Sequence, residues 1–202
     1  VDLPLNNDFS KKNNFYLVAA LNSLLRRYSI RIVSIQNTSN EFNARFSALK
    51  RCYLYKFLCR SAPSAILQNQ VWHIRKKIDL NAMKKASEYL IGNHDFTSFR
   101  STSCQASSPC KTIDKFEFYF SEDILTMRIE AKSFLHNQVR IIAGSLIKVG
   151  IEIWKPIIIK NILESKSRTS AGETAPPNGL YLEKIIYPDK LLKSSWSKYI
   201  FD

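Results

Sequence analysis

Residues 125–150 read LTMRIEAKSFLHNQVRIIAGSLIKVG, and two hydrophobic periods meet within this stretch. Apolar and polar residues alternate at first, which is the period of a strand with one buried face, and the apolar ones are Leu125, Met127, Ile129 and Ala131. The spacing then changes to three and four residues, and the apolar residues become Val139, Ile142, Ala143 and Leu146. The stretch therefore predicts a strand that leads, over a short polar connection, into a helix packed back on the sheet.

Arg140 lies off this apolar stripe, in or near the first turn of the predicted helix. Gly144 follows one turn later, and we expect it to leave room beside the long arginine side chain. A guanidinium near the positive end of a helix is well placed to bind a carboxylate or a phosphate. The alternative is a solvent-exposed helix arginine, and this stretch taken alone favours that alternative.

The chain is strongly basic, with 30 Lys and Arg against 17 Asp and Glu among 202 residues and a net charge of +13. The isoelectric point is near 9.7. The basic residues are spread along the sequence, which suits a broad surface that faces phosphates better than a disordered tail. The charge favours a polyanionic partner, nucleic acid first, although a basic surface without a function remains the alternative.

Several classes of protein are not indicated. No apolar run approaches the roughly 20 residues that span a bilayer, and the N-terminus does not resemble a signal peptide, so we expect a cytoplasmic protein. The four cysteines have spacings that fit neither a zinc site nor a CxxC redox pair, so we expect reduced thiols: Cys52, Cys59, Cys104 and Cys110. The three histidines are scattered, and no metal site is expected.

The remaining chain predicts alternating strands and helices. Strands are expected at residues 30–35, 51–59, 111–120 and 180–186, with a short extended segment at 71–75. The strand at 51–59 has apolar residues on both faces and is therefore expected to be central, whereas 111–120 should form an antiparallel hairpin with the strand after it. Helices are expected at 15–28, from Asp79 or Asn81 to 91 with Gly92 as the C-cap, and at 156–166; residues 168–179 should be irregular.

Four stretches, in this order, resemble the bacterial tRNA pseudouridine synthase A family. They are FNARFSA with RCYLYKF (42–57), GNHDFTSFR (92–100), FLHNQVRIIAG (134–144) and GLYL (179–182). Each stretch is weak alone, but together with their spacing they cover nearly the whole chain.

The resemblance implies a fold, a reaction and partners. The fold would be α+β, a mixed and mostly antiparallel sheet with helices packed on one face, formed by a single domain over residues 1–202. The family acts as a homodimer on tRNA, without cofactor or metal, and isomerises uridines of the anticodon stem-loop to pseudouridine. An aspartate attacks, the glycosidic bond breaks, and the detached uracil turns and rejoins the ribose through carbon.

The resemblance also assigns roles to individual residues. The tyrosine of the R-x-Y-x-Y strand, here Tyr53, lies against the target base and offers a stacking face and a phenol near the C5 proton. The arginine of the H-x-x-V-R segment, here Arg140, pairs with the catalytic carboxylate and helps hold the flipped nucleotide. Arg45 and His136, which belong to matched stretches, are predicted to bind substrate as well.

The chain departs from the family pattern at the nucleophile. The family's aspartate lies in a G-R-T-D-x-G-V-H motif before the first helix, and nothing in this sequence matches it. Asp2 and Asp8 lack the motif's glycine and arginine, and Asp95 is predicted to cap a helix-to-loop joint.

We therefore expect the C-terminal, larger part of the family fold, without its first strands and inactive alone. The alternatives are a non-catalytic RNA-binding module of the same fold and, more weakly, an unrelated basic α+β domain whose motifs match by chance.

Overall fold

The computed structural model describes residues 14–189, which belong to two compact units. The larger unit is Lys50–Ile186, and the smaller combines the residues before Lys50 with those after Ile186. No helix in the described part of the chain is long and apolar enough to cross a membrane. The prediction of a single domain over residues 1–202 stays a prediction.

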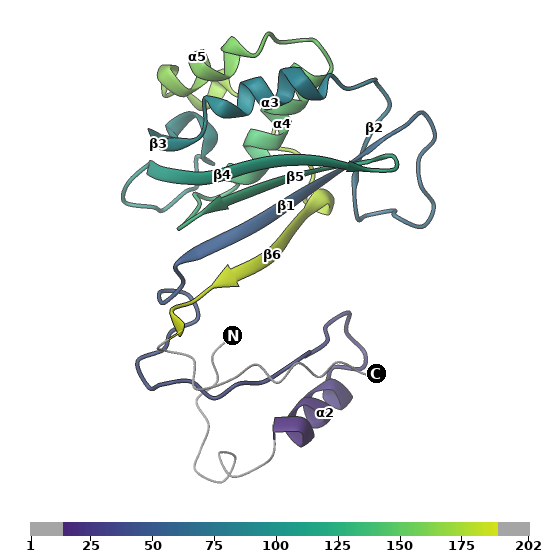
Figure 1. The fold of residues 1–202 in the computed structure, drawn as a ribbon, viewed down its shortest axis with the longest axis vertical. Helices are drawn as coiled ribbons and strands as arrows, with labels where there is room; N and C mark the ends of the chain where they lie inside the picture. The colour runs from purple at the N-terminus through teal and green to yellow at the C-terminus, as the bar shows by residue number, and fades with distance from the viewer. Residues whose placement is uncertain (1–13, 190–202) are drawn as a thin grey trace. The chain divides into compact units, whose positions relative to one another are not determined.

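A six-stranded sheet organises the larger unit (Figure 1). Its main path is β2 (Trp72–Ile74), β1 (Lys50–Cys59), β5 (Ile124–Ala131), β4 (Cys110–Ser121) and β3 (Gly92–Asp95), and β6 (Leu180–Ile186) pairs with β1. Only β1 and β2 are parallel; the other pairs are antiparallel. This confirms the mixed, mostly antiparallel sheet, and β1, paired along both of its edges, is the central strand that was predicted.

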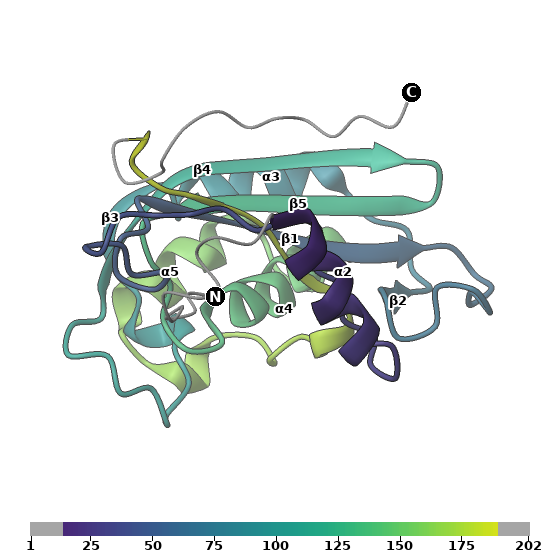
Figure 2. The same ribbon diagram turned by 90° about the horizontal axis from the view of Figure 1, so that it is seen from below.

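The hairpin of β4 and β5 forms as the alternating pattern predicts (Figure 2). Phe116, Phe118 and Phe120 lie opposite Ile129, Met127 and Leu125 on one face. The strands turn over two residues, Glu122 and Asp123, and Glu122 takes a positive φ of 53°.

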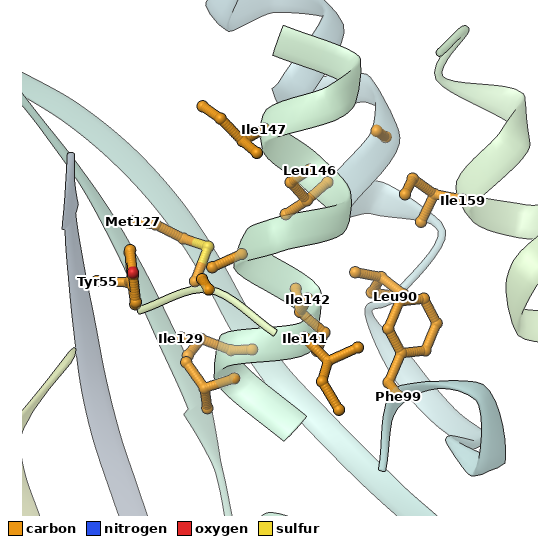
Figure 3. Packing of buried hydrophobic residues seen from close by; sticks show 14 of the residues in the cluster. Tyr55, Leu90, Phe99, Met127, Ile129, Ile141, Ile142, Leu146, Ile147 and Ile159 are labelled. Atoms are coloured by element: carbon orange, nitrogen blue, oxygen red, sulfur yellow. The ribbon is translucent and has the colours of Figure 1, made fainter. Parts of the chain in front are cut away.

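Three helices lie on one side of this sheet (Figure 1): α3 (Leu80–Glu88), α4 (Gln138–Gly150) and α5 (Ile157–Ser165). Helix α4 is buried along nearly its whole length, which confirms the helix predicted to pack back on the sheet. Its core side chains lie between those of the sheet and those of the outer elements (Figure 3). The figure labels Ile141, Ile142, Leu146 and Ile147 of α4, Tyr55, Met127 and Ile129 of the sheet, and Leu90, Phe99 and Ile159 of the outer elements. Burial of these side chains holds the layers together.

The opposite face of the sheet carries a charge cluster centred on Arg128 of β5. Its guanidinium contacts Glu183 Oε2 at 2.7 Å and Glu117 Oε2 at 3.1 Å, and it also pairs with Glu130. These carboxylates come from β6, β4 and β5. One cation therefore ties three strands together across the sheet.

Replacing Arg128 with methionine is expected to lower the free energy of unfolding by roughly 1–3 kcal/mol, because three neighbouring carboxylates then lose their shared cation and repel one another. Lys115 Nζ remains 2.8 Å from Glu117 and offsets part of this loss. Arg60→Met is the matched control, since Arg60 forms an exposed pair with Asp123 at 3.4 Å, and such pairs contribute about 0–1 kcal/mol. Urea denaturation followed by circular dichroism measures both variants. Equal losses in the two would contradict a special role for Arg128.

Two local predictions in the smaller unit and one in the larger unit are wrong. Helix α2 (Asn14–Leu24) ends four residues before the predicted end at 28, and residues 30–35 form no strand. Instead, the side-chain amide of Asn22 both donates to Ile32 O and accepts from Ile32 N, each at 2.8 Å, in place of a neighbouring strand. Gly92 is not a helix C-cap: Tyr89 ends α3, and Gly92, with φ of 102°, begins β3.

Of the two capping predictions, the one for Asp79 is confirmed and the one for Asp95 is wrong. Asp79 is the N-cap of α3, because its Oδ1 accepts from Ala82 N at 2.9 Å. Asp95 is the last residue of β3, so the predicted helix-to-loop joint is not found there. Its Oδ1 instead holds the turn after the strand, since it accepts from Thr97 N at 2.9 Å and from Thr97 Oγ1 at 2.6 Å. Its other oxygen lies 3.5 Å from Lys166 Nζ. Asp95 therefore has a structural role.

The contacts of Asp95 predict a pH dependence. The pKa of this carboxyl lies below its usual range, because the Thr97 hydrogen bonds and then the Lys166 contact outweigh the opposing effect of burial. A folded-state pKa below the unfolded value stabilises the protein above the unfolded value of about 4, and this stabilisation is lost as the pH falls through the folded value. Asp95→Asn should therefore flatten the fall in stability below about pH 4, as measured by thermal unfolding at several pH values. Parallel curves for the two proteins would contradict the assignment.

Candidate active site

The residues between β5 and α4 fix the beginning of α4, where Arg140 lies. Asn137, the N-cap of α4, has a left-handed backbone with φ of 61°. Gln138 follows it, and its Oε1 accepts from Leu135 N at 2.8 Å, while Gln138 N donates to Leu135 O at 3.1 Å. These bonds fix the point at which α4 begins, and with it the position of Arg140 in the first turn.

Arg140 is half-buried and its guanidinium is anchored on one edge. Nε donates to Ala175 O at 2.7 Å, and Nη1 donates to Asn137 Oδ1 at 3.1 Å. The backbone bond from Ala175 N to Arg140 O, 3.2 Å, holds the same two segments together. Within residues 14–189, Nη2 donates to no acceptor and no carboxylate pairs with Arg140. The anchored guanidinium therefore keeps one nitrogen for an incoming anion.

The segment that receives Arg140, residues 172–176, is packed on α4 without intervening side chains. A Cβ on Gly144 would lie 3.0 Å from the carbonyl carbon of Glu173 and closer still to its oxygen. Gly172 N donates to Ser145 Oγ at 2.9 Å. The expectation that Gly144 leaves room beside the arginine side chain is therefore wrong: the backbone of Glu173 fills that space, and its proximity brings Ala175 within reach of Arg140.

The two tyrosines of β1 have different surroundings. Tyr55 is fully buried, and its hydroxyl donates to Pro176 O at 2.7 Å. Burial raises the pKa of Tyr55, and the Arg140 charge opposes that rise. Tyr53 is half-buried, and its ring lies edge-on to Phe134 with 5.3 Å between centroids. Tyr55 is thus a core residue with a satisfied hydroxyl, whereas Tyr53 borders the connection that leads to Arg140.

The other two predicted site residues lie in different units. His136 is exposed in the connection between β5 and α4, and its Nδ1 lies 3.3 Å from Ser103 Oγ. Arg45 belongs to the smaller unit, where it is exposed and its guanidinium lies over the Phe46 ring at 5.4 Å. The larger unit therefore brings Tyr53, His136 and Arg140 to one connection.

Prediction from sequence missed the partners that hold them, namely Asn137, Ala175 and Ser103; of these, only Asn137 lies in a matched motif.

The nucleophilic and metal-ligating side chains of the described residues add no further site here. The four cysteines are all free thiols. Within residues 14–189, no three His, Cys, Asp or Glu side chains are grouped as they would be around a metal ion.

The fold and this connection define a basic α+β domain in which a half-buried tyrosine borders the connection and an arginine with one available nitrogen follows it. The family model described as tRNA pseudouridine synthase matches residues 86–188, a range that includes His136 and Arg140 but not Arg45 or Tyr53. The chain is 46% identical over 168 residues to tRNA pseudouridine synthase A of Ehrlichia canis, covering 83% of this chain and 69% of that protein. It is 44% identical over 181 residues to the protein of the same name from Ehrlichia chaffeensis (89% and 74%) and 40% identical over 176 residues to that from Anaplasma phagocytophilum (87% and 72%). The chain belongs to the tRNA pseudouridine synthase family, whose members are isomerases.

Proposed function

We propose that this chain binds tRNA and converts uridines of the anticodon stem-loop to pseudouridine, together with an aspartate that its 202 residues do not supply. The observation that carries the proposal is the half-buried guanidinium of Arg140, fixed by Ala175 and Asn137 with Nη2 available. A positioned cation of this kind suits a carboxylate that must remain ionised. The net charge of +13 supports a polyanionic substrate.

Each residue has a defined part in the proposed reaction. Arg140 pairs through Nη2 with the nucleophilic carboxylate and holds the flipped nucleotide. Tyr53 stacks against the target base and places its phenol near C5. The aspartate carboxylate attacks ribose C1′, and the bond from C1′ to uracil N1 breaks. The uracil turns, a bond forms from C5 to C1′ as the bond from C1′ to the carboxylate breaks, and the C5 proton leaves while N1 takes up a proton. The isomerisation is thus balanced without a cofactor.

We also propose that the protein works in the cytoplasm as a homodimer, with the basic side chains of its surface contacting tRNA phosphates. Such contacts position the RNA and supply most of the affinity, whereas Tyr53 and Arg140 act at one nucleotide.

A binding and turnover experiment tests this function. The purified chain should bind unmodified tRNA better than heparin or an unrelated RNA of equal length, with an affinity that falls steeply as salt rises. It should form no pseudouridine alone. Equal affinity for all polyanions would favour an unrelated basic domain, and pseudouridine formed by the chain alone would show that the nucleophile lies within it.

The absent G-R-T-D motif favours a second candidate, a non-catalytic RNA-binding module. A joined enzyme separates the two: a segment that carries the family's G-R-T-D-x-G-V-H motif is fused before this chain. Pseudouridine formation by the joined enzyme supports the synthase, because the chain then contributes a working Tyr53 and Arg140. Tight tRNA binding without turnover supports the module.

A further inference from the structure

The serine-rich loop between η1 (Thr97–Phe99) and β4 contacts His136 through two of its polar groups. Ser101 N donates to His136 O at 3.0 Å, and Ser103 Oγ lies 3.3 Å from His136 Nδ1. The backbone carbonyl and one ring nitrogen of His136 are therefore held by one short segment, residues 101–104.

The segment that holds His136 is itself ordered by internal bonds. Cys104 N donates to Ser101 O at 3.0 Å, which closes a turn. The hydroxyls of Ser101 and Ser103 lie 3.0 Å apart. Because Ser103 is bonded on both sides, the imidazole of His136 has a defined orientation although the residue is exposed. The rotamer freedom that an exposed histidine would lose on binding a ligand is already restricted.

The position of His136 suits an anion. Asn137, its neighbour in sequence, accepts from Arg140 Nη1. Cys104 supports a positive local field: although burial raises its pKa, the backbone N–H groups of Ala106 and His136 and the charges of Arg100 and Lys111 together lower it. Within residues 14–189, Nε2 of His136, on the far side of the ring from Ser103, has no partner.

We propose that Ser103 is a positioning residue, which orients the His136 imidazole so that Nε2 contacts a backbone phosphate of the RNA beside the target nucleotide. This rests on the proposed function, since the RNA is the ligand. Ser103 acts through His136 and does not touch the RNA itself. Residues 101–104 thereby support the substrate-binding face through His136, whereas the rest of the loop has no part in it.

A double-mutant cycle on RNA affinity tests the proposal. The probe is a fluorescein-labelled, unmodified anticodon stem-loop RNA, titrated with the full chain at fixed salt. Ser103→Ala should weaken binding about threefold to tenfold, the range of one net hydrogen bond. Ser103→Thr keeps the hydroxyl and should stay within about twofold of the unsubstituted protein. His136→Ala should lose at least as much as Ser103→Ala, and adding Ser103→Ala to it should cost nothing further.

Ser107→Ala is the matched control, since Ser107 is an exposed serine of the same loop, and its affinity should not change. The proposal is overturned if Ser103→Ala binds normally, if Ser103→Thr fails to rescue, or if the losses of Ser103→Ala and His136→Ala multiply in the double variant. Thermal midpoints of all variants show whether a loss of affinity comes from a loss of folding. The unsubstituted protein reports separately on the proposed function: if it binds RNA without preference for the stem-loop, that function fails, while the cycle still decides the role of Ser103.

Discussion

Replacing Gly144 with alanine is expected to lower the free energy of unfolding by roughly 2–4 kcal/mol, a large fraction of the stability of a domain of this size. Alanine normally stabilises a helix by about 1 kcal/mol relative to glycine. Here the added Cβ would overlap the backbone of Glu173, and neither α4 nor residues 172–176 can move without breaking hydrogen bonds. The displaced segment should also withdraw Ala175 from Arg140.

Gly150→Ala is the matched control, because Gly150 lies in the same helix and is also buried. Its Cβ would lie 2.6 Å from the Met83 sulfur, 2.9 Å from Met83 Cγ and 3.1 Å from Ile78 Cγ2, and these side-chain atoms can shift more readily than the backbone of Glu173. We therefore expect a smaller loss than at Gly144. Urea denaturation measures both variants, and an equal effect at the two positions would show that the Glu173 contact does not limit stability.

Arg140→Lys is expected to reduce turnover of the joined enzyme on the order of 10²–10³-fold while leaving tRNA affinity within a few-fold. Lysine keeps the positive charge but cannot contact Ala175, Asn137 and a carboxylate at once, since it lacks the planar fork of donors. Tyr53→Phe should have the same signature, with turnover reduced on the order of 10²-fold or more because the phenol is lost and the stacking ring remains. The measurements are pseudouridine formed under single-turnover conditions and RNA affinity.

A second arginine controls for structural effects on residues 172–176. Arg168 donates to Gly172 O at 3.0 Å and to Thr174 Oγ1 at 3.1 Å, so it holds the same segment. Arg168→Lys should loosen that segment without touching the carboxylate site, and we expect a turnover loss below about tenfold. If Arg140→Lys and Arg168→Lys lost turnover equally, Arg140 would act only by holding the segment. Normal turnover in both Arg140→Lys and Tyr53→Phe would show that the site is wrongly assigned.

The strands and helices of the larger unit could be predicted from sequence because burial imposes a period on them. The alternation of residues 125–131 and the helical spacing after Val139 correspond closely to β5 and α4. Residues 30–35 are rich in β-branched residues but form no strand in the described structure. A strand needs a partner strand, and the backbone of Ile32 bonds the Asn22 side chain instead. Local composition does not encode that choice.

The candidate site was predictable only in part for a related reason. Arg140 and His136 lie in a recognisable motif, and the assignment of substrate-binding roles to Tyr53, Arg140, Arg45 and His136 stays a prediction. The groups that hold them are largely backbone atoms and small residues distant in sequence, such as Ala175 O. A backbone carbonyl leaves no residue pattern, and the close approach at Gly144 depends on tertiary packing.

The pairing of β1 has a consequence for biosynthesis. Among the strands of the larger unit β1 leaves the ribosome first, and one of its edges is completed largely by β6, the last strand of that unit. A nascent chain released before Leu180 would expose that edge, which invites pairing with other chains. Ala175 and Pro176, which bond Arg140 and Tyr55, are synthesised immediately before β6. The contacts of Arg140 and the pairing along this edge of β1 thus form in the same late step. A nascent chain that ends before Ala175 lacks both the edge pairing that limits aggregation and the complete guanidinium site.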